Sequence, residues 1–560
     1  MAEVWRVGSG GGTANTISAL REALLVQRGI LPAAAESFFE PRYERDVHDP
    51  RALQQMEVAV QRLRRARRRS ERVLVYGDYD ADGVCGTALL LTALRESGVE
   101  AVPYLPHRLE DGYGLNLRVL ERLAAEFDVL ISVDCGVSNA AEIGWLQERG
   151  RDVIVVDHHT LPEVLPEALA ILHPALGGYP WPFLSGSGVA WKLAQALLED
   201  RTGDPEAEKW LLDLCCLGTV ADMVPLLGEN RAVVRFGLEV LRRSRRPGVQ
   251  QLLKLIRHGE EISSEAVGYR LAPLLNAAGR MDHAQPALDL LLAATRERAE
   301  ALMVRLCRYN DERRTVSRRV QAEAERVVEA ASPVAFAYNK QWPAGVVGLV
   351  AGRLSELLSR PSVVIGSGGA HAVGSVRAPV GYNVLEMLQG VRELVITVGG
   401  HARAAGFSVS WGNVDGMREA LLNSLPPPRA AQREERADAV IDGALLGWES
   451  VSLLEQFQPY GFGNERPALV VKDVPLIDWR PVGKTRDHAK MRFQVNFETM
   501  DGIGFGLAKT PVTQTLQPGA AVDVLGYLES NEYRGRRSLQ LRVRDMAPAG
   551  TVRIVPVTSN

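Results

Sequence analysis

The sequence predicts an α/β protein in which two α/β domains are joined by a long helix and followed by a small C-terminal β-barrel. Three observations carry this prediction. Residues 73–160 alternate short apolar strands with amphipathic helices, residues 296–331 are charged and lack Gly and Pro, and from about 467 strands alternate with turns. Strand–helix alternation is typical of a parallel sheet covered on both faces by helices. With 560 residues, the chain is long enough for three or four domains.

The first α/β domain is predicted from its segments in chain order. Short apolar runs indicate strands at 72–77, 99–106, 128–136 and 151–157. Amphipathic segments between them indicate helices at 85–97, 116–127 and 138–150. Further helical segments continue to about residue 295, including 188–200 and 232–244.

The second half of the chain contains comparable strand and helix patterns. A second α/β unit is expected between about 333 and 422, with strands near 332–338, 361–366 and 393–400 and a helix at 346–359. Residues 425–438 are rich in proline and charge, which is typical of a linker. Barrel strands are expected at 467–479, 491–502, 521–531 and 538–546. We therefore expect a basic helical extension, an α/β domain, a connecting helix, a second α/β domain, a linker and a barrel, at 1–70, 71–295, 296–331, 332–424, 425–466 and 467–550.

Composition places the chain among globular proteins. Hydrophobic residues make up 46% and charged residues 24%, enough to bury several cores. The N-terminal segment has no basic region followed by an apolar core, and no apolar run approaches the roughly 18–20 residues of a membrane span. The five cysteines form no CxxC pair and no zinc-finger spacing, so we expect reduced thiols in a cytoplasmic protein.

Although the net charge is only −3, arginine residues are clustered at several places along the chain. The main runs are at 62–72, 242–246 and 305–319. Each run has two interpretations, a contact for a polyanion or a solvated helix face.

Acidic residues follow three of the predicted parallel strands, at the point where each strand ends. They are Asp78, Asp80, Asp82, Asp134 and Asp157, the last followed by His158 and His159. Open α/β sheets bind their ligands at the carboxyl ends of the strands. Crowded carboxylates repel one another unless cations are bound. Oxygen-rich ligation without thiolate favours Mn²⁺ or Mg²⁺ over zinc.

A further carboxylate, Asp222, stands in the apolar segment 218–226. Taken alone it has a second interpretation, a helix cap or a hydrogen-bonded core carboxylate.

Four short motifs that contain these acidic residues occur in the same order as in the DHH phosphoesterase superfamily and resemble its motifs. They are GDYDADG (77–83), VDCGVS (133–138), VVDHH (155–159) and GTVADMVPL (218–226). Three later motifs resemble those of the RecJ branch with its DHHA1 domain: LNAAGRM (275–281), GSVRAP (374–379) and GGHARAAG (399–406). A fourth segment, QPYGFGNERP (458–467), resembles the one that leads into the oligonucleotide-binding (OB) barrel of that branch. Two departures stand out. Tyr76 occupies a position where many superfamily members have histidine, and Pro343-Ala344 replace a frequent His-Glu pair.

The resemblance implies a metal-dependent exonuclease that degrades single-stranded DNA from the 5′ end, in DNA repair and recombination. It implies two divalent cations, Mn²⁺ or Mg²⁺, which clamp the attacking and leaving oxygens of a phosphodiester. One ion would be held by Asp80, Asp134, His158 and Asp222, and the other by Asp78 and Asp134, with Asp82 nearby.

Catalytic and DNA-binding roles are assigned by the same resemblance. Asp157 would orient an imidazole, while His159 would touch the scissile phosphate or protonate the leaving oxygen. The alternative for His159 is a structural histidine. His401, in a glycine-rich turn expected to enter a helix, would bind the scissile phosphate. Residues expected to contact other phosphates or DNA are Arg108, Tyr113, Asn276, Arg280, Ser375 and Arg377.

The barrel would add stacking and backbone contacts to the single strand. Family resemblance also suggests a single-strand-binding protein and a RecQ-type helicase as partners, no membrane, and a monomer. Two rival functions remain open: a DHH phosphodiesterase for short oligonucleotides or cyclic dinucleotides, and an inactive binding protein of replication. Phosphodiesterases of that kind generally lack the barrel and the basic N-terminal extension. An inactive binding protein is expected to have lost some of the metal-ligating residues.

Overall fold

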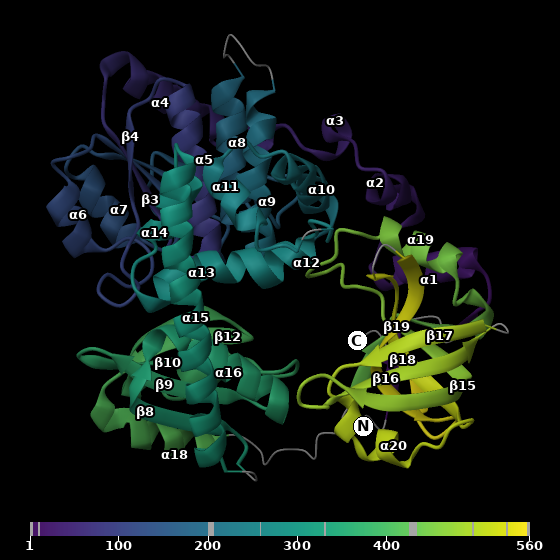
Figure 1. Ribbon diagram of the computed structural model, residues 1–560. Helices are drawn as coiled ribbons and strands as arrows, with labels where there is room; N and C mark the ends of the chain where they lie inside the picture. The colour runs from purple at the N-terminus through teal and green to yellow at the C-terminus, as the bar shows by residue number, and fades with distance from the viewer. Residues whose placement is uncertain are drawn as a thin grey trace. The chain divides into compact units, whose positions relative to one another are not determined.

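The computed structural model describes residues 4–8, 12–199, 206–257, 259–329, 332–424, 434–495, 498–533 and 536–556 (Figure 1). The chain forms two compact units. The larger contains residues 47–224 and 232–431, and the smaller contains residues 1–46, 225–231 and 432–560. None of the described helices is long and apolar enough to cross a membrane. All five cysteines are free thiols.

The first sheet of the larger unit is fully parallel, with strand order β4-β3-β5-β6-β7. Its strands are β3 (Val73–Gly77), β4 (Ala101–Tyr104), β5 (Val129–Val133), β6 (Asp152–Val156) and β7 (Ala170–Leu172). Every residue of β3 and β5 is buried, as expected for central strands covered on both faces. The predicted α/β alternation is therefore present, with β7 as an additional strand.

Helices pack on both faces of this sheet. Alternate residues of β3, β5 and β6 contact one apolar cluster with the helices α6 (Leu117–Leu123) and α7 (Ala140–Gln147). On the other side lie α5 (Ala81–Glu96) and α8 (Gly186–Leu198), which pack against each other and against α9 (Leu212–Ala221). Other described helices are α3 (Tyr43–Asp46), α4 (Met56–Arg69), α10 (Gly228–Arg242), α11 (Pro247–Leu253), α12 (Ser264–Ala266), α13 (Ala272–Met281) and α14 (Gln285–Leu291).

The connecting helix α15 (Arg296–Val327) follows the predicted range closely. It packs against α13 and against α16 (Ala344–Leu358), the first helix of the second α/β domain. The second domain is built on a mixed sheet of order β11-β12-β10-β9-β8, in which only β8 and β9 are parallel. Its elements are β8 (Ala335–Pro343), β9 (Ser362–Gly368), β10 (His371–Arg377), β11 (Val395–His401), β12 (Ala404–Val409), α17 (Val384–Gln389) and α18 (Val414–Ser424).

One sequence expectation in this domain is wrong. Residues 399–406 do not enter a helix: they join β11 to β12 as an antiparallel hairpin, in which His401 pairs with Ala404. The glycine-rich composition is equally typical of a tight turn. The neighbouring β10, which pairs with β12, is an additional strand that the sequence pattern does not predict.

The smaller unit contains a closed barrel of five strands. They are β15 (Leu469–Val482), β16 (His488–Val495), β17 (Glu498–Gly504), β18 (Ala521–Tyr533) and β19 (Arg536–Pro548). The barrel closes because β16 pairs with both β15 and β17. Alternate residues of β16, such as Met491 and Phe493, point into the core. Helices α1 (Ile17–Gln27), α2 (Ala35–Phe39), α19 (Trp448–Gln456) and α20 (Pro511–Thr515) belong to the same unit.

The N-terminal segment is not the separate helical extension that the sequence predicts over 1–70. Strand β1 (Val4–Val7) lies between β13 (Glu434–Ala437) and β20 (Arg553–Pro556), and β2 (Thr13–Ala14) pairs with β14 (Ala439–Ile441). The basic helix α4 belongs instead to the larger unit. The predicted linker 425–466 is likewise wrong from residue 434 onward, where β13, β14 and α19 form, and residues 425–433 lie outside the described residues.

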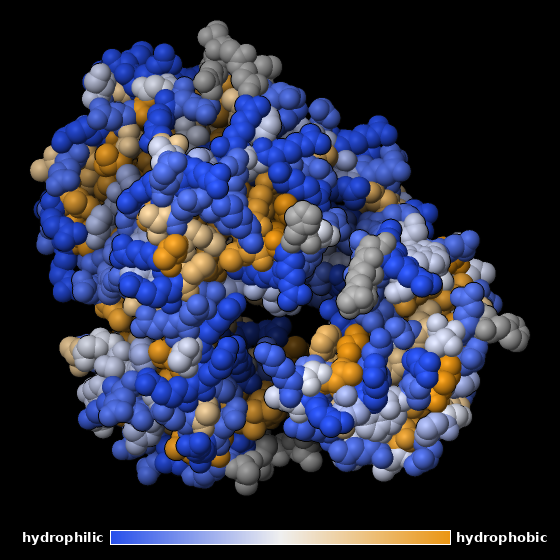
Figure 2. All heavy atoms as spheres, in the orientation of Figure 1, coloured by the Kyte–Doolittle hydropathy of each residue, from blue (hydrophilic) through white to orange (hydrophobic). Residues whose placement is uncertain are grey.

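The basic run at 62–72 is partly structural. Arg62 is buried and its guanidinium forms ion pairs with Glu71 and Asp152. The face of the molecule in Figure 2 is largely hydrophilic and carries several separate hydrophobic patches.

Candidate metal centre

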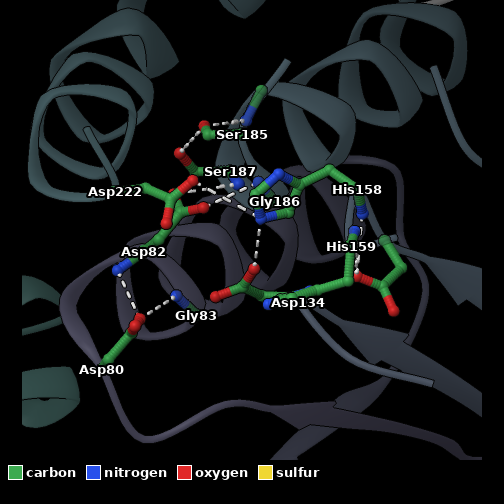
Figure 3. A network of polar contacts seen from close by, with 12 residues as sticks. Asp80, Asp82, Gly83, Asp134, His158, His159, Ser185, Gly186, Ser187 and Asp222 are labelled. Atoms are coloured by element: carbon green, nitrogen blue, oxygen red, sulfur yellow. Dashed lines mark hydrogen bonds and ion pairs between the residues drawn. The ribbon is translucent and has the colours of Figure 1, made fainter. Parts of the chain in front are cut away.

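Acidic and imidazole side chains converge at the carboxyl ends of β3, β5 and β6 (Figure 3). The loop after β3 carries Asp78 and Asp80, and Asp82 lies in the first turn of α5. Asp134 follows β5, and Asp222 follows α9 as its C-cap residue. Because parallel strands end at one edge, residues that are distant in sequence meet there, as the sequence predicts.

The ligand atoms form three overlapping groups, within each of which all atoms lie within 4.8 Å of one another. The groups are Asp78, Asp80 and Asp134; Asp82, His158 and Asp222; and Asp134, His158 and His159. Asp134 is shared by two groups, which is the arrangement expected of a bridging carboxylate. Two neighbouring cations fit this donor set.

Several of these atoms have no hydrogen-bond partner. Among the described residues, Oδ1 of Asp78, Oδ1 of Asp134 and Nε2 of His158 are buried and make no hydrogen bond. Nε2 of His158 lies 3.2 Å from Oδ1 of Asp134 and 3.4 Å from Oδ2 of Asp222, close but without hydrogen-bond alignment. A buried polar atom without a partner is costly, and two divalent cations bound by these groups would satisfy all three atoms.

Burial and mutual repulsion raise the pKa values of several aspartates of the centre. Burial, reinforced by the charge of Asp80, raises the pKa of Asp78 to about 7 and that of Asp82 to about 6. The same causes, burial first and then the neighbouring aspartates, raise the pKa of Asp134 and Asp222 well above the usual range. Burial lowers the pKa of His158 to about 3, so its imidazole is neutral and able to bind a metal. Cations would remove the repulsion that these carboxylates otherwise experience.

The grouping differs from the ligand sets expected from the resemblance. Asp82, rather than Asp80, lies with His158 and Asp222, whereas Asp80 joins Asp78 and Asp134. Asp80 is the N-cap of α5, where Oδ1 accepts hydrogen bonds from the N–H groups of Asp82 and Gly83. Asp82 faces the N-terminus of α8, whose Gly186 and Ser187 N–H groups donate to its carboxylate at 2.6 and 3.1 Å.

Two glycines allow this close packing. A Cβ at Gly186 would lie 2.4 Å from Oδ1 of Asp134, and one at Gly218 would lie 2.4 Å from Oδ1 of Asp82. Both positions are therefore needed for the geometry of the centre, although nothing in the sequence apart from the presence of glycine indicates this role.

Asp157 organises the loop after β6. Its Oδ1 lies 2.8 Å from Nδ1 of His159 and accepts the N–H of His158, while Oδ2 accepts the N–H of Val137. Although burial opposes ionisation, these hydrogen bonds and the nearby imidazoles lower the pKa of Asp157. The same pairing outweighs burial and raises the pKa of His159. Asp157 therefore fixes the orientation of the His159 ring, and the role of this pair in catalysis stays a prediction.

Tyr113 lies beside this pair, with its hydroxyl 3.1 Å from Nε2 of His159 and donating to the carbonyl of Asp134 at 3.3 Å. Tyr76, which replaces the frequent family histidine, is fully buried and donates to the carbonyl of Gly114. Tyr76 is therefore a core residue and not a ligand.

The second α/β domain contributes His401 to the same site. Its ring is nearly parallel to that of His159, at 10° and 6.3 Å between centroids, and Nδ1 lies 3.4 Å from Oγ1 of Thr160. A cavity of about 360 Å³ opens here, lined by His158, His159, Thr160, Leu161, His173, Ala175, Pro182, Asp222 and His401. The hairpin places His401 at the metal centre even though the expected helix is absent.

Arginines gather near the centre. Arg108 stacks over the ring of Tyr79 at 3.9 Å and donates to the carbonyl of Gly279. Burial, followed by the charges of Arg108, Arg313 and Arg377, lowers the pKa of Arg280 to about 9. Mutual repulsion of this kind marks a site suited to an anion. The sequence does not single out Arg313, on α15, because this residue stands within a basic run that is also typical of a solvated helix face.

Ser375 and Arg377 lie together on β10, where Nη1 of Arg377 donates to Oγ of Ser375 at 2.6 Å. Asn276 supports the loop that carries the candidate metal-binding aspartates, because its Oδ1 accepts the N–H of Ala81 at 2.9 Å. Its expected contact with DNA stays a prediction.

Three family models match the chain: the N-terminal domain of the DHH family over 72–219, the DHHA1 domain over 331–425, and the RecJ OB domain over 437–545. The chain is 34% identical to the single-stranded-DNA-specific exonuclease RecJ of Bacillus subtilis, covering 95% of this chain and 68% of that protein. It is 33% identical to the Escherichia coli protein of the same name, covering 89% of this chain and 91% of that protein.

Solved structures agree with these matches. The structure of RecJ from Thermus thermophilus in complex with Mn²⁺ superposes with a TM-score of 0.84 at 27% identity, covering 98% of this chain and 80% of that chain. A structure of exonuclease RecJ bound to manganese has a TM-score of 0.62 at 34% identity, covering 68% of this chain and 98% of that chain.

Proposed function

The chain belongs to the RecJ family of single-stranded-DNA-specific exonucleases, and we propose that it removes nucleotides from the 5′ end of single-stranded DNA with the help of two divalent cations. The observation that carries this proposal is the set of buried, unpartnered ligand atoms around Asp134. Mn²⁺ and Mg²⁺ suit such oxygen-rich ligands, and the related structures were solved with these ions.

The residues of the centre divide into holding and reacting groups. Asp78, Asp80 and Asp134 would hold one cation, and Asp82, His158 and Asp222 the other, with Asp134, whose Oδ1 lies 3.2 Å from Nε2 of His158, shared by both. When bound, the pair supplies charge neutralisation of the phosphodiester and activation of water.

His159 is the proposed proton donor to the leaving 3′ oxygen. Asp157 binds its Nδ1 and thereby fixes the orientation of the ring, as a carboxylate does beside a catalytic imidazole. His401, parallel to His159 across the cavity, is proposed to bind the scissile phosphate.

We propose that digestion starts at the 5′ end because a pocket formed by Arg280, Ser375 and Arg377 binds the 5′-terminal phosphate. A terminal monophosphate carries about −1.5 to −2 charge at pH 7, more than an internal diester, so a cationic pocket favours that end. Arg108 and Tyr113 are proposed to contact the first nucleotide.

The barrel is proposed to bind the single strand. Its surface carries an exposed Phe505 whose ring is in edge contact with His488 at 5.2 Å, a pairing on which a base can stack. By family resemblance we also propose action in DNA repair and recombination in the cytoplasm, as a monomer, together with a single-strand-binding protein and a RecQ-type helicase.

Digestion of end-labelled strands tests the proposal. With Mn²⁺, a 5′-labelled single strand should release labelled mononucleotide at once, whereas a 3′-labelled strand should shorten progressively. Arg377→Gln should lower kcat/KM on 5′-phosphorylated strands about tenfold or more, because one charge-assisted hydrogen bond contributes about 1.5–3 kcal/mol. Arg392→Gln, an exposed arginine of the same domain, is the control. Release of label from the 3′ end first would refute the direction.

A further inference from the structure

One turn of α16 lies between the two arginines of the proposed phosphate pocket. Gly345 packs against the backbone of Arg280, where a Cβ would come within 1.9 Å of the carbonyl oxygen. Gly348, one turn later, faces the other side of the pocket. A Cβ at Gly348 would lie 3.3 Å from Nη2 of Arg377 and 3.3 Å from Oγ of Ser375.

The guanidinium of Arg377 is anchored on one side only. Its Nη1 donates to Oγ of Ser375 at 2.6 Å, to the carbonyl of Val376 at 2.9 Å and to that of Ala405 at 3.4 Å. Within the described part of the chain, no residue accepts a hydrogen bond from Nη2. The atom that faces Gly348 is therefore the one available for an incoming anion.

We propose that Gly348 determines strand-end specificity, because the absence of a side chain leaves room beside Nη2 of Arg377 and Oγ of Ser375 for the oxygens of a 5′-terminal phosphomonoester. This inference rests on the proposed function. It adds a residue that acts by having no side chain and so leaving room for the ligand. No pattern of charged or hydrogen-bonding residues in the sequence indicates such a role.

The physical basis is the distance that a phosphate oxygen needs. A charge-assisted N–H···O hydrogen bond is about 2.7–2.9 Å long. A methyl group in contact with both Nη2 and Oγ would occupy the position of that oxygen. The guanidinium cannot easily withdraw, since three hydrogen bonds hold Nη1.

The helix provides a matched control. Gly352 lies one turn further along α16, and a Cβ there would meet no heavy atom within 4 Å. Neither glycine has a positive φ, so alanine fits the backbone at both positions. Gly348→Ala and Gly352→Ala therefore make the same gain in helix propensity and differ only in what the methyl group touches.

The experiment compares wild type, Gly348→Ala and Gly352→Ala as full chains on one strand of about 20 nucleotides, a convenient length for anisotropy, with either a 5′-phosphate or a 5′-hydroxyl. Two quantities are measured: kcat/KM with Mn²⁺, and the dissociation constant by fluorescence anisotropy in EDTA. Gly348→Ala should lower kcat/KM and affinity about tenfold on the phosphorylated strand and leave the hydroxyl strand unchanged. Gly352→Ala should behave as wild type.

The outcomes separate this inference from the function on which it rests. A wild-type preference for phosphate that survives Gly348→Ala but disappears in Arg377→Gln would overturn the role of Gly348 alone. An equal loss on both strands would also overturn it, because the glycine would then serve packing. If wild type shows no preference, the phosphate pocket itself is wrong and the inference fails with it.

Discussion

Asp134 has a left-handed backbone conformation, with φ of 63°, and its carboxylate points into the centre from the end of β5. Asparagine tolerates this conformation better than alanine, so Asp134→Asn tests the carboxylate without straining the turn. Removing the shared ligand should lower Mn²⁺-dependent turnover by at least about 100-fold, the scale on which even an outer metal contact acts. Turnover and Mn²⁺ stoichiometry by calorimetry are the measurements.

The control for Asp134→Asn is Asp128→Asn, which removes a carboxylate at the opposite end of β5. It should keep two bound ions. Two ions and wild-type turnover in Asp134→Asn would show that this residue does not bridge the metals.

The acids of the centre also predict how stability depends on pH in the metal-free protein. The pKa of Asp78 is raised from 3.8 to about 7 and that of Asp82 to about 6. Between about pH 4 and 7 the folded state therefore binds protons that the unfolded state has released, so the free energy of unfolding falls as pH rises through this window. Mn²⁺ competes with these protons, and its stabilising effect should grow with pH.

Melting temperatures from about pH 5 to 8, with EDTA and with Mn²⁺, check this dependence. In EDTA the Tm should fall toward higher pH, and the Mn²⁺-induced increase should be larger at the higher pH. Asp78→Asn should flatten the EDTA curve. A Tm in EDTA that rises over the same range would contradict the assignment.

At the scale of elements, β1 connects the N-terminus to the C-terminal unit. Trp5 is fully buried between β13 and β20, and its Nε1 donates to Oδ2 of Asp545 at 3.1 Å. Trp5→Ala should destabilise the smaller unit by about 3–5 kcal/mol, the cost of removing a large buried side chain. Arg6→Ala, at a neighbouring position on the same strand whose side chain reaches the surface, should change the Tm little.

Denaturant unfolding monitored by single-strand binding gives the readout for β1. Trp5→Ala should lose strand affinity at lower denaturant than wild type while Mn²⁺ binding persists. Equal midpoints for Trp5→Ala and Arg6→Ala would show that β1 does not support the unit.

The elements that could be predicted are those with a strong local pattern. Strands β3, β5 and β6 are continuous apolar runs followed by acids, and this pattern also predicts the metal centre. Strands β1 and β2 could not be predicted, because they are short and gain their stability from partners more than about 400 residues away. Which of Asp80 and Asp82 lies beside His158 and Asp222 could not be predicted from the sequence either. The position of Asp82 depends on hydrogen bonds from the N-terminus of α8, which the local sequence does not indicate.

For the molecule as a whole, we expect the larger unit to carry hydrolysis and the smaller unit to strengthen binding of the single strand, and truncation can test this. Ending the chain near residue 425 would leave residues 1–46 without the strands with which they pair. A better truncation keeps residues 47–424, which contain every proposed metal ligand. It should retain Mn²⁺-dependent hydrolysis of single strands.

Strand affinity should distinguish the truncation from the full chain. Every backbone phosphate that the barrel neutralises should add about 0.7 to the slope of log Kd against log salt for a single strand. The truncated protein should therefore bind more weakly and less salt-dependently, and release strands after fewer cleavages. The measurements are anisotropy across salt concentrations and product lengths under single-turnover conditions.

The truncation needs a control for newly exposed surface at residues 225–231, which belong to the smaller unit. Within that unit, Arg231 donates to the carbonyl of Phe457, and the N–H of Leu226 donates to the carbonyl of Phe462. Substituting Arg231 and Leu226 by serine in the truncated protein removes a cation and an apolar side chain that the full chain covers. The salt slope should be the same with and without these substitutions, because a strand held at the metal centre does not need them. Identical salt slopes for the full chain and the truncation would mean that the barrel binds no DNA backbone.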